Sequence, residues 1–433
     1  MKLRKFDLKD KKTLLAVAAV CTAFVLLFGG IITAVVLISR RKENPHEEAA
    51  AAVEHMRGVW IASVSNIDFP SAPDLTKEQL ESELDSIVDT ADAAGLNAVF
   101  FQVRPSADAL YASDIFPVSR YMSTDGTLTL DALEYLCAAA HKKGIAVHAW
   151  INPLRVAAGG DIDSLPDNSP AKKNPAWVVK YADGKLYFDC GREEVRKLIC
   201  DGIKEIVENY DVDGVVFDDY FYPYPKYIQA SDGTSALAEF DDGDTFAEYG
   251  RDFDDIGDWR RDNVNKLVRG AYETVKSADE HCAFGVAPFG IWKNGYGDES
   301  GSETRGSQSY YDIYCDTVAW IEGGYVDYVA PQLYWRESES AAPYDALCDW
   351  WSSTVEEKGD GIKLIICHAA YRYEDDWENP AGTMLSQLRY ASEKNVYSGS
   401  VFYGYEEIRD NLHGIRDELL EFYGAKNSEE STN

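Results

Sequence analysis

The sequence predicts an α/β protein whose main part is a closed (β/α)8 TIM barrel, preceded by one N-terminal transmembrane helix. Three observations predict the barrel. Eight short runs of β-branched and aromatic residues are each followed by a longer amphipathic segment, and three of the connections are unusually long. Alternating strands and helices are typical of a parallel sheet, and eight such pairs are the number that closes into a barrel.

The expected elements alternate regularly along the chain. Strands are expected over 57–64, 98–103, 145–151, 214–217, 283–288, 327–333, 363–368 and 399–403. Helices are expected over 77–94, 130–143, 193–209, 258–278, 309–323, 343–358, 383–393 and 406–423. The enlarged loops follow strands three, four and five, over 155–191, 222–257 and 291–307. These loops leave the carboxyl ends of strands, which is the barrel face that carries active sites.

The N-terminal segment predicts a membrane anchor. Residues 13–38 are uncharged and mostly apolar, and this run is long enough to cross a bilayer. A cleavable signal peptide is the alternative, but Ser39-Arg40-Arg41-Lys42 follows where a small-residue cleavage site would stand. More Lys and Arg residues precede the run than follow it, which places residues 1–12 in the cytoplasm.

The predicted organisation is therefore that of a single-pass protein of the cell membrane. A linker over 39–55 leads to an extracytoplasmic TIM-barrel domain over 56–424, and a polar, disordered tail is expected over 425–433. The membrane, reached through the N-terminal helix, is the first expected partner.

Charge and cysteine usage narrow the expected partners. The net charge of -32 argues against nucleic acid, because binding a polyphosphate depends on Lys and Arg. A neutral or weakly charged glycan is easier to accommodate. The seven cysteines after the apolar segment show no CxxC pair and no regular spacing, so buried free thiols are expected, with one or two disulfides as the alternative. We expect neither a metal nor a cofactor.

Polar and aromatic residues gather where the expected strands end. In strand order they are Asn66 and Asp68; Gln102, Arg104 and Asp108; His148, Trp150, Asn152 and Arg155; Asp218, Asp219 and Tyr220; Trp292; Gln332, Tyr334 and Trp335; His368 and Tyr371; and Tyr403, Tyr405 and Glu406. Glycosidases need such a mixture, because carboxylates act as acid, base or nucleophile and flat side chains pack on sugar rings.

The fourth strand carries the sharpest signal, because a buried run ends in two adjacent acids, Asp218 and Asp219. Side chains alternate across a strand, so if Val216 faces the barrel axis, Asp218 and Tyr220 face it too. Asp218 is therefore the first catalytic candidate. Asp219 would orient a neighbour or supply the second carboxylate. The structural alternative is that the pair caps the strand or holds Arg104 or Arg155 in an ion pair.

Five segments together resemble a known family. RGVWIASVSNIDFPS (57–71), FQVRPSADALYASDIFPVS (101–119), HAWINPLR (148–155), DVDGVVFDDYFYPYP (211–225) and APQLYW (330–335) closely resemble the glycosyl-hydrolase-like ten family. The resemblance covers about residues 56–424. It implies a TIM-barrel hydrolase of a group that is often membrane-anchored and that includes a divisome-localised enzyme cleaving denuded peptidoglycan glycans.

The fourth strand also looks like a degenerate form of the chitinase DGxDxDxEYP pattern. Asp213, Asp218 and the Tyr222-Pro223 pair stand in corresponding places, but Tyr220 replaces the acid glutamate and Val216 the middle aspartate. A chitinase mechanism therefore cannot be carried over whole. Either an N-acetyl group of the substrate or a second carboxylate could be the nucleophile. For the second carboxylate we rank Asp219 first, followed by Glu406 and Asp68.

The remaining residues are expected to bind substrate, each with a structural alternative. His148 could equally be a core histidine, and any one of the large aromatics could fill the barrel. Arg104 and Arg155 could form structural ion pairs or hold a muramic carboxylate in a bidentate fork. The expected binding set is Asn66, Asp68, Arg104, His148, Trp150, Asn152, Arg155, Tyr220, Trp292, Gln332, Tyr334 and Trp335.

The leading functional prediction is a glycoside hydrolase of a cell-wall glycan, namely denuded peptidoglycan strands or a related N-acetylhexosamine polymer, with cell-division or wall-synthesis proteins as expected partners. A non-catalytic glycan-binding barrel that acts in cell division is the alternative. A metal-dependent hydrolase is less favoured, because strand one carries Ser63, Val64 and Ser65 where barrel amidohydrolases place a His-x-His pair.

Overall fold

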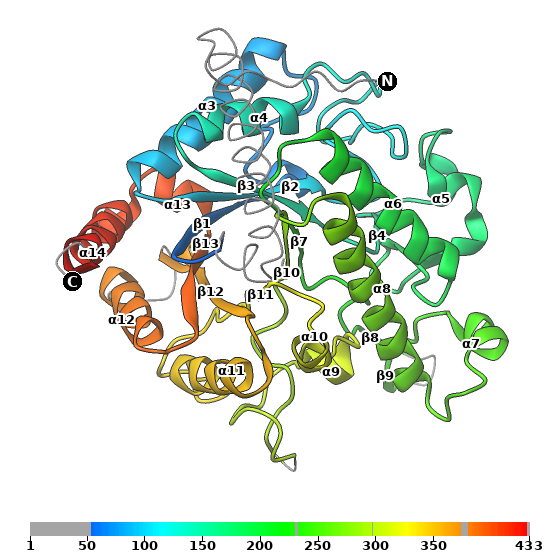
Figure 1. Cartoon of the computed structure of the whole chain (residues 1–433). Helices are drawn as coiled ribbons and strands as arrows, with labels where there is room; N and C mark the ends of the chain where they lie inside the picture. The colour runs from blue at the N-terminus through cyan, green and yellow to red at the C-terminus, as the bar shows by residue number, and fades with distance from the viewer. Residues whose placement is uncertain (1–52, 230–232, 297, 374–379, 431–433) are drawn as a thin grey trace, which may run out of the picture. The chain divides into compact units, whose positions relative to one another are not determined.

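The structure is a computed structural model that describes residues 53–229, 233–296, 298–373 and 380–430 (Figure 1). The chain divides into two units, 1–48 and 49–433, and all described residues belong to the second. The expected transmembrane helix over 13–38 and most of the expected linker lie outside the described residues. Within the described part, none of the helices is both long and apolar enough to span a membrane.

Eight parallel strands close into a barrel, which confirms the predicted TIM-barrel fold (Figure 1). Neighbouring strands pair in parallel all the way round, in the order β1-β13-β12-β11-β10-β7-β3-β2. The strands are β1 (Met56–Ile61), β2 (Ala98–Arg104), β3 (Ala146–Ile151), β7 (Gly214–Phe217), β10 (Ala283–Val286), β11 (Tyr328–Val329), β12 (Lys363–Ala369) and β13 (Tyr397–Tyr403).

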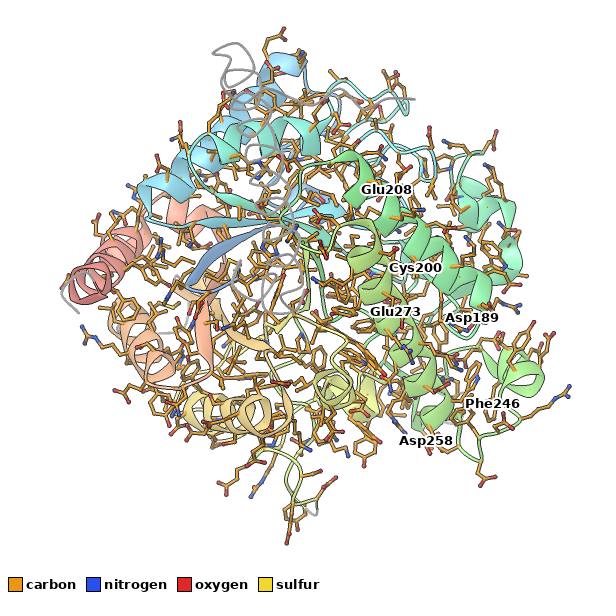
Figure 2. All side chains as sticks on the ribbon, in the orientation of Figure 1. Asp189, Cys200, Glu208, Phe246, Asp258 and Glu273 are labelled. Carbon is orange, nitrogen blue, oxygen red and sulfur yellow. The ribbon has the colours of Figure 1, made fainter. Side chains whose placement is uncertain are left out.

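Helices cover the outside of the barrel (Figure 1). The main ones are α3 (Lys77–Ala93), α4 (Ala132–His141), α6 (Glu193–Asn209), α8 (Ile256–Ala278), α10 (Thr317–Gly323), α11 (Tyr344–Lys358), α12 (Pro380–Ser392) and α14 (Ile415–Glu430). α3 begins with a capping box, in which Thr76 and Gln79 bond each other's backbone N–H. α6 and α8 approach closely, since a Cβ on Gly270 would lie 3.3 Å from Cys200 Sγ; Figure 2 labels Cys200 on α6 and Glu273 on α8.

The strands separate two apolar layers. Val215 and Phe217 point outward into the large core between strands and helices, whereas Val216 points inward. The inward layer needs glycines for room. A Cβ on Gly285 would lie 2.2 Å from the Tyr328 ring, and one on Gly214 would lie 2.3 Å from His148 Nδ1. These glycines let two large side chains fill the barrel interior.

The long connections carry small elements of their own. The loop after β3 forms a three-stranded antiparallel sheet from β4 (Arg155–Ala157), β5 (Val178–Lys180) and β6 (Leu186–Phe188), with the short helix α5 (Pro170–Lys173). The loop after β7 forms a hairpin of β8 (Tyr227–Gln229) and β9 (Ser235–Leu237) and then α7 (Gly243–Tyr249). α9 (Ser309–Asp312) and α13 (Tyr405–Arg409) follow β10 and β13.

Several expected boundaries were wrong. The strands expected over 57–64 and 283–288 end at Ile61 and Val286, and the helix expected over 406–423 is divided into α13 and α14. β11 ends at Val329, because Pro331 has no N–H to continue the strand pairing. Gln332 still forms isolated bridges with Phe289 and Cys367 of the adjacent segments. The helix expected over 309–323 is split into α9 and α10 around Tyr314, whose φ of 57° is left-handed. α14 runs on to Glu430, so residues 425–430 of the expected disordered tail are helical.

All seven cysteines of the described domain are free thiols, as expected from their spacing. Six of them are buried and Cys200 is half-buried. Burial raises the pKa of several of these thiols, which for Cys190 and Cys348 reaches about 12. They are therefore protonated at neutral pH and act as small apolar residues of the core.

Candidate active site

Asp218 lies where β7 ends, on the inner side of the barrel. It is buried, and its carboxylate accepts three hydrogen bonds from neutral donors. Trp150 Nε1 and Asn152 Nδ2 donate to Oδ2 over 2.9 and 3.1 Å, and the backbone N–H of Tyr220 donates to Oδ1 over 3.1 Å. The inward direction of Val216 is thus continued by Asp218, and the neighbouring strand β3 supplies the two side chains that hold it.

Asp219 is also buried and is held by a different set of groups. Gln332 Nε2 donates to Oδ1 over 3.0 Å and also to Ala287 O over 3.0 Å, which ties Asp219 to the ends of β10 and β11. The Tyr224 hydroxyl donates to Oδ2. The two adjacent acids therefore lie in one polar cluster but are held by different strands: Asp218 by residues of β3 and its loop, and Asp219 by groups at the ends of β10 and β11.

Burial changes the acidity of both groups. It raises the pKa of Asp218 to about 7, and the adjacent Asp219 adds to this rise, whereas Arg155 and the Trp150 hydrogen bond oppose it. Burial also raises the pKa of Asp219, against the hydrogen bonds from Tyr224 and Gln332. Two neighbouring buried carboxyls resist ionising together, so the pair retains a proton near neutral pH.

Arg155 is the cation of this cluster. Its guanidinium lies 5.0 Å from the centre of the Tyr220 ring, and its Nε donates to Pro105 O over 2.8 Å. Its backbone N–H donates to Asn152 Oδ1 over 3.1 Å, which orients the amide that binds Asp218. Arg155 also lowers the pKa of both Asp218 and Asp219, so its guanidinium lies near the two acids.

Tyrosines form the walls around the carboxylates. Tyr220 stacks on Tyr224 with ring centres 4.7 Å apart, and Tyr334 stacks on Tyr403 at 6.2 Å. The Tyr371 ring meets both Tyr334 and Tyr403 edge-on. Such flat, half-buried faces are suited to packing against sugar rings.

Asp68 is a third carboxyl at the same end of the barrel. Its Oδ2 accepts the N–H of Ala62 over 2.7 Å, which fixes it where β1 ends. Burial raises its pKa to about 7, with Glu406 and Glu407 adding to the rise. Asp68 and Asp218 both raise the pKa of Tyr403, so both carboxyls lie near that residue.

Glu406, the other candidate for the second carboxylate, is exposed at the start of α13. It forms an ion pair with Arg409, 3.3 Å between Arg409 Nη2 and Glu406 Oε1. The structure thus brings Asp219 and Asp68 to the buried cluster and leaves Glu406 at its outer edge.

Two expected binding residues, Arg104 and His148, lie away from the two acids. Arg104 is buried under α6, 3.6 Å from the Phe116 ring, because a register shift after Gln102 turns it out of the barrel. His148 is sealed in the barrel interior, stacked on Phe100 and bonded to Tyr328 at 2.9 Å. Burial lowers the pKa of His148 to about 4, so it is a neutral core residue.

Two aromatic and two polar residues from the strand ends also make their contacts away from the two acids. Trp292 stacks on Trp350 and donates to Asp316, and Trp335 packs on Gly290. Asn66 Nδ2 bonds the carbonyls of Pro70 and Tyr121, and Gln102 Oε1 accepts the N–H of Ser63 and Val64. These contacts fix loops and packing, and none of them joins the four side chains to Asp218 or Asp219.

Two residues of the cluster were not among the expected site residues. Tyr224 contacts Asp219 although it lies five positions further along the chain, in a loop whose path the sequence does not reveal. Tyr403 was recognised as a strand end but not as a wall of the site. The Tyr-Pro-Tyr-Pro run over 222–225 is the signal that could have indicated Tyr224, because proline fixes the loop backbone.

A cleft of about 880 Å³ opens beside the cluster. It is lined by the loops that follow β1, β2 and β3, including Asn66, Asp108, Arg120, Val156 and Asn168. The loops come from the same end of the barrel as Asp218. An extended, polar cleft at this end can hold more of a chain-like substrate than the carboxylate cluster alone.

A (β/α)8 barrel with buried carboxyls and aromatic walls at its carboxyl face has the architecture of a glycoside hydrolase. The model of the family Glycosyl hydrolase-like 10 matches residues 55–379. Glycosyl hydrolase YngK of Bacillus subtilis (strain 168) is 38% identical over 384 residues, covering 87% of this chain and 73% of YngK. Glycosyl hydrolase DigH of Escherichia coli (strain K12) is 36% identical over 360 residues, covering 77% of this chain and 79% of DigH.

The chain belongs to the glycosyl hydrolase-like 10 family, and it is a glycosidase, a hydrolase that acts on O-glycosyl bonds. Solved structures show the same fold at low identity. The glycoside hydrolase domain of PgaB (BpsB) from Bordetella bronchiseptica has a TM-score of 0.53 at 13% identity, covering 84% of this chain and 98% of that one. The β-amylase catalytic domain from Paenibacillus polymyxa has a TM-score of 0.51 at 11% identity, covering 84% and 94%.

Proposed function

We propose that this glycosidase cleaves a cell-wall glycan, namely peptidoglycan strands without stem peptides or a related N-acetylhexosamine polymer. The observation that carries the proposal is Asp218, a buried carboxyl with a pKa of about 7 held by neutral donors at the catalytic end of the barrel. Such a group still carries a proton at neutral pH and can give it to a leaving glycosidic oxygen.

Asp218 acts as the general acid in this proposal. Trp150 and Asn152 both donate to Oδ2, so the proton is carried on Oδ1, which also accepts the N–H of Tyr220. When the proton leaves, the three donors stabilise the carboxylate that remains. The fixed donors therefore favour the charge that develops during bond cleavage.

Asp219 is the first choice for the second carboxylate, and Asp68 is the next. Asp219 accepts hydrogen bonds from Tyr224 and Gln332, which oppose the rise in its own pKa, while its charge raises the pKa of Asp218. Asp219 can therefore activate water or orient an N-acetyl group of the substrate. Asp68 is a candidate because it is fixed where β1 ends and is close enough to Tyr403 to raise the pKa of that residue. Glu406 is the third choice because it is exposed.

The charge of the site supports a weakly charged polymer. The protein as a whole is strongly acidic, so a polyanion would be repelled, but Arg155 places one cation beside the acids. A single muramic carboxylate per disaccharide fits that pattern, with the Arg155 guanidinium as its partner. The Tyr220 and Tyr224 pair and the Tyr334 and Tyr403 pair offer apolar faces for the sugar rings.

The proposal also includes the location of the enzyme. An apolar run over 13–38 with flanking basic residues would hold the catalytic domain outside the cell membrane, next to the wall. Contacts with cell-division or wall-synthesis proteins belong to the same proposal.

The test is release of sugar products, detected by mass spectrometry, from denuded and from peptide-bearing peptidoglycan treated with the full chain. Wild type is compared with Asp218→Asn and Asp219→Asn, and Asp213→Asn at the opposite end of the barrel is the matched control. We expect products from denuded strands with wild type and with the control, and at least about 10²-fold slower product release with Asp218→Asn. Hydrolysis of neither substrate by wild type would disprove the proposed substrate.

A further inference from the structure

The loop after the candidate acids carries an exposed aromatic surface that the reaction itself does not use. The residues of β8 and β9 are all exposed, and the register of the two strands places Tyr227 opposite Leu237, on one face of the hairpin. Tyr227 is 70% exposed and Leu237 is 50% exposed. Exposed apolar side chains that cluster in this way mark a binding surface.

A small pocket of about 170 Å³ lies beside this hairpin. Tyr227 and Leu237 line one side and Tyr311 on α9 lines another, with Tyr311 51% exposed. Two flat rings from separate elements therefore flank one cavity. The cavity is smaller than the roughly 300–1,000 Å³ typical of drug-sized ligands, so it is suited to a single small ring.

The polar groups of the pocket are hydrogen-bond acceptors. Glu239 is exposed at its rim, and Asp312 accepts the Gln308 N–H over 2.8 Å, which leaves its second oxygen for a ligand. Arg260 is the basic residue that lines this pocket. It forms an ion pair with Asp242, to whose carboxylate its Nε donates over 2.9 Å. The pocket thus offers carboxylates to hydroxyl donors and no unpaired cation to an anion.

The pocket is continuous along the chain with the catalytic cluster. Tyr224 bonds Asp219 and stacks on Tyr220, and Tyr227 follows three residues later, a Cα separation of at most about 11 Å. A polymer that leaves the acids along Tyr224 would reach this surface directly. A partner helix would need a longer groove than this pocket provides.

From these observations we propose that Tyr227, Tyr311, Glu239 and Asp312 form a second saccharide-binding site, which holds an uncharged sugar unit of the polymer outside the catalytic cluster. The site rests on the proposed function, because it binds a distant part of the same glycan. Its role is to retain long strands: the rings stack on the sugar faces and the carboxylates accept sugar hydroxyls.

The test is binding of peptide-free glycan strands to the full chain that carries Asp218→Asn, so that no cleavage occurs. Adding Tyr227→Ala and Tyr311→Ala should weaken binding by about tenfold, since two aromatic contacts are lost. Tyr249→Ala is the control, because Tyr249 is 51% exposed on α7 but does not line this pocket. Equal affinities in the parent, the double variant and the control would overturn the second site.

Cleavage separates this idea from the proposed function. With Asp218 intact, the double variant should have a raised KM for long strands and an unchanged KM for an N-acetylglucosamine tetrasaccharide. Equal losses on both substrates would mean that the tyrosines serve the catalytic cluster itself, which contradicts a second site. If wild type cleaves neither substrate, the proposed function fails, while the binding comparison still decides whether the site exists. Circular dichroism melts should be unchanged, as both tyrosines are exposed.

Discussion

Aspartates adjoin the strands at both ends of the barrel, and their hydrogen-bond partners differ between the two ends. At the amino end, Asp213 accepts the N–H of Val147 and a hydrogen bond with His141, and Asp327 accepts the N–H of Phe284. At the carboxyl end, Asp218 is held by side-chain and backbone N–H groups that carry no charge.

The amino-end acids join neighbouring strands. Asp213 stands before β7 and bonds β3, and Asp327 stands before β11 and bonds β10, while Lys276 Nζ lies 2.7 Å from Asp327 Oδ2. These acids bond the backbone of neighbouring strands, and this makes them structural. Neutral donors and burial leave Asp218 with a raised pKa, so the same residue type becomes a proton donor.

The largest expected effect separates the ends by activity. Asp218→Asn should lower kcat by about 10²- to 10⁴-fold, because a general acid contributes this much. The pKa of Asp218 is raised to about 7 in the folded protein. Protonated Asp218 therefore contributes fully to the free energy of unfolding below the pKa of the unfolded chain, and this contribution is lost as the pH rises through about 7. The variant, which cannot ionise, should therefore melt no lower than wild type at pH 8. A melting temperature well below wild type would show that Asp218 is structural.

The converse change should affect stability alone. Asp327→Ala leaves Lys276, whose side chain is 12% exposed, without its partner, and should lower the free energy of unfolding by about 3–5 kcal/mol. Activity per folded molecule should stay at the wild-type level. Urea unfolding gives the first quantity and kcat at low temperature gives the second. A large loss of kcat with normal stability would erase the distinction between the two ends.

The comparison also predicts the pH dependence of the reaction. If Asp218 must be protonated, kcat/KM should fall above about pH 7, to about one-tenth at pH 8 in the limiting slope. This decrease in kcat/KM at alkaline pH, the alkaline limb of the pH profile, should be absent from the residual activity of Asp218→Asn. An activity that is constant from pH 6 to pH 9 would exclude Asp218 as the acid.

A smaller change should move that limb. Trp150→Phe removes a donor to the Asp218 carboxylate, which favours the protonated form and should raise its pKa by about one unit. The alkaline limb should shift upward while kcat falls only several-fold. Trp60→Phe is the matched control, because Trp60 packs on Trp150 at 4.9 Å in the same interior layer but is not one of the three donors to Asp218. The same shift in both variants would indicate a packing effect.

The smallest effect is expected at the edge of the site. Glu406→Gln should change kcat by less than about twofold, since Glu406 is exposed and its ion pair with Arg409 is a surface one. Asp68→Asn, measured beside it, should have the larger effect because Asp68 is fixed by the Ala62 N–H. A larger loss in Glu406→Gln would make Glu406 the second carboxylate.

The sequence alone determined the barrel and the place of its chemistry. Apolar runs define the strands, and period-two alternation turned Asp218 inward behind Val216, where the structure has it. Both follow from local rules: a strand buried on both faces must be apolar, and its side chains alternate. Polar residues at the strand ends therefore lie close to the acids: Asn152 donates to Asp218, and Gln332 donates to Asp219.

Only the tertiary structure decided which of those residues belong to the site. A register shift between Gln102 and Arg104 directs the Arg104 side chain outward, beneath α6. Gly214 has no side chain, and this leaves room for His148 in the barrel interior. Loop paths brought Tyr224 to Asp219. Alternation ends where a strand bulges or becomes a loop, so these placements depend on packing between distant segments, which no local pattern in the sequence encodes.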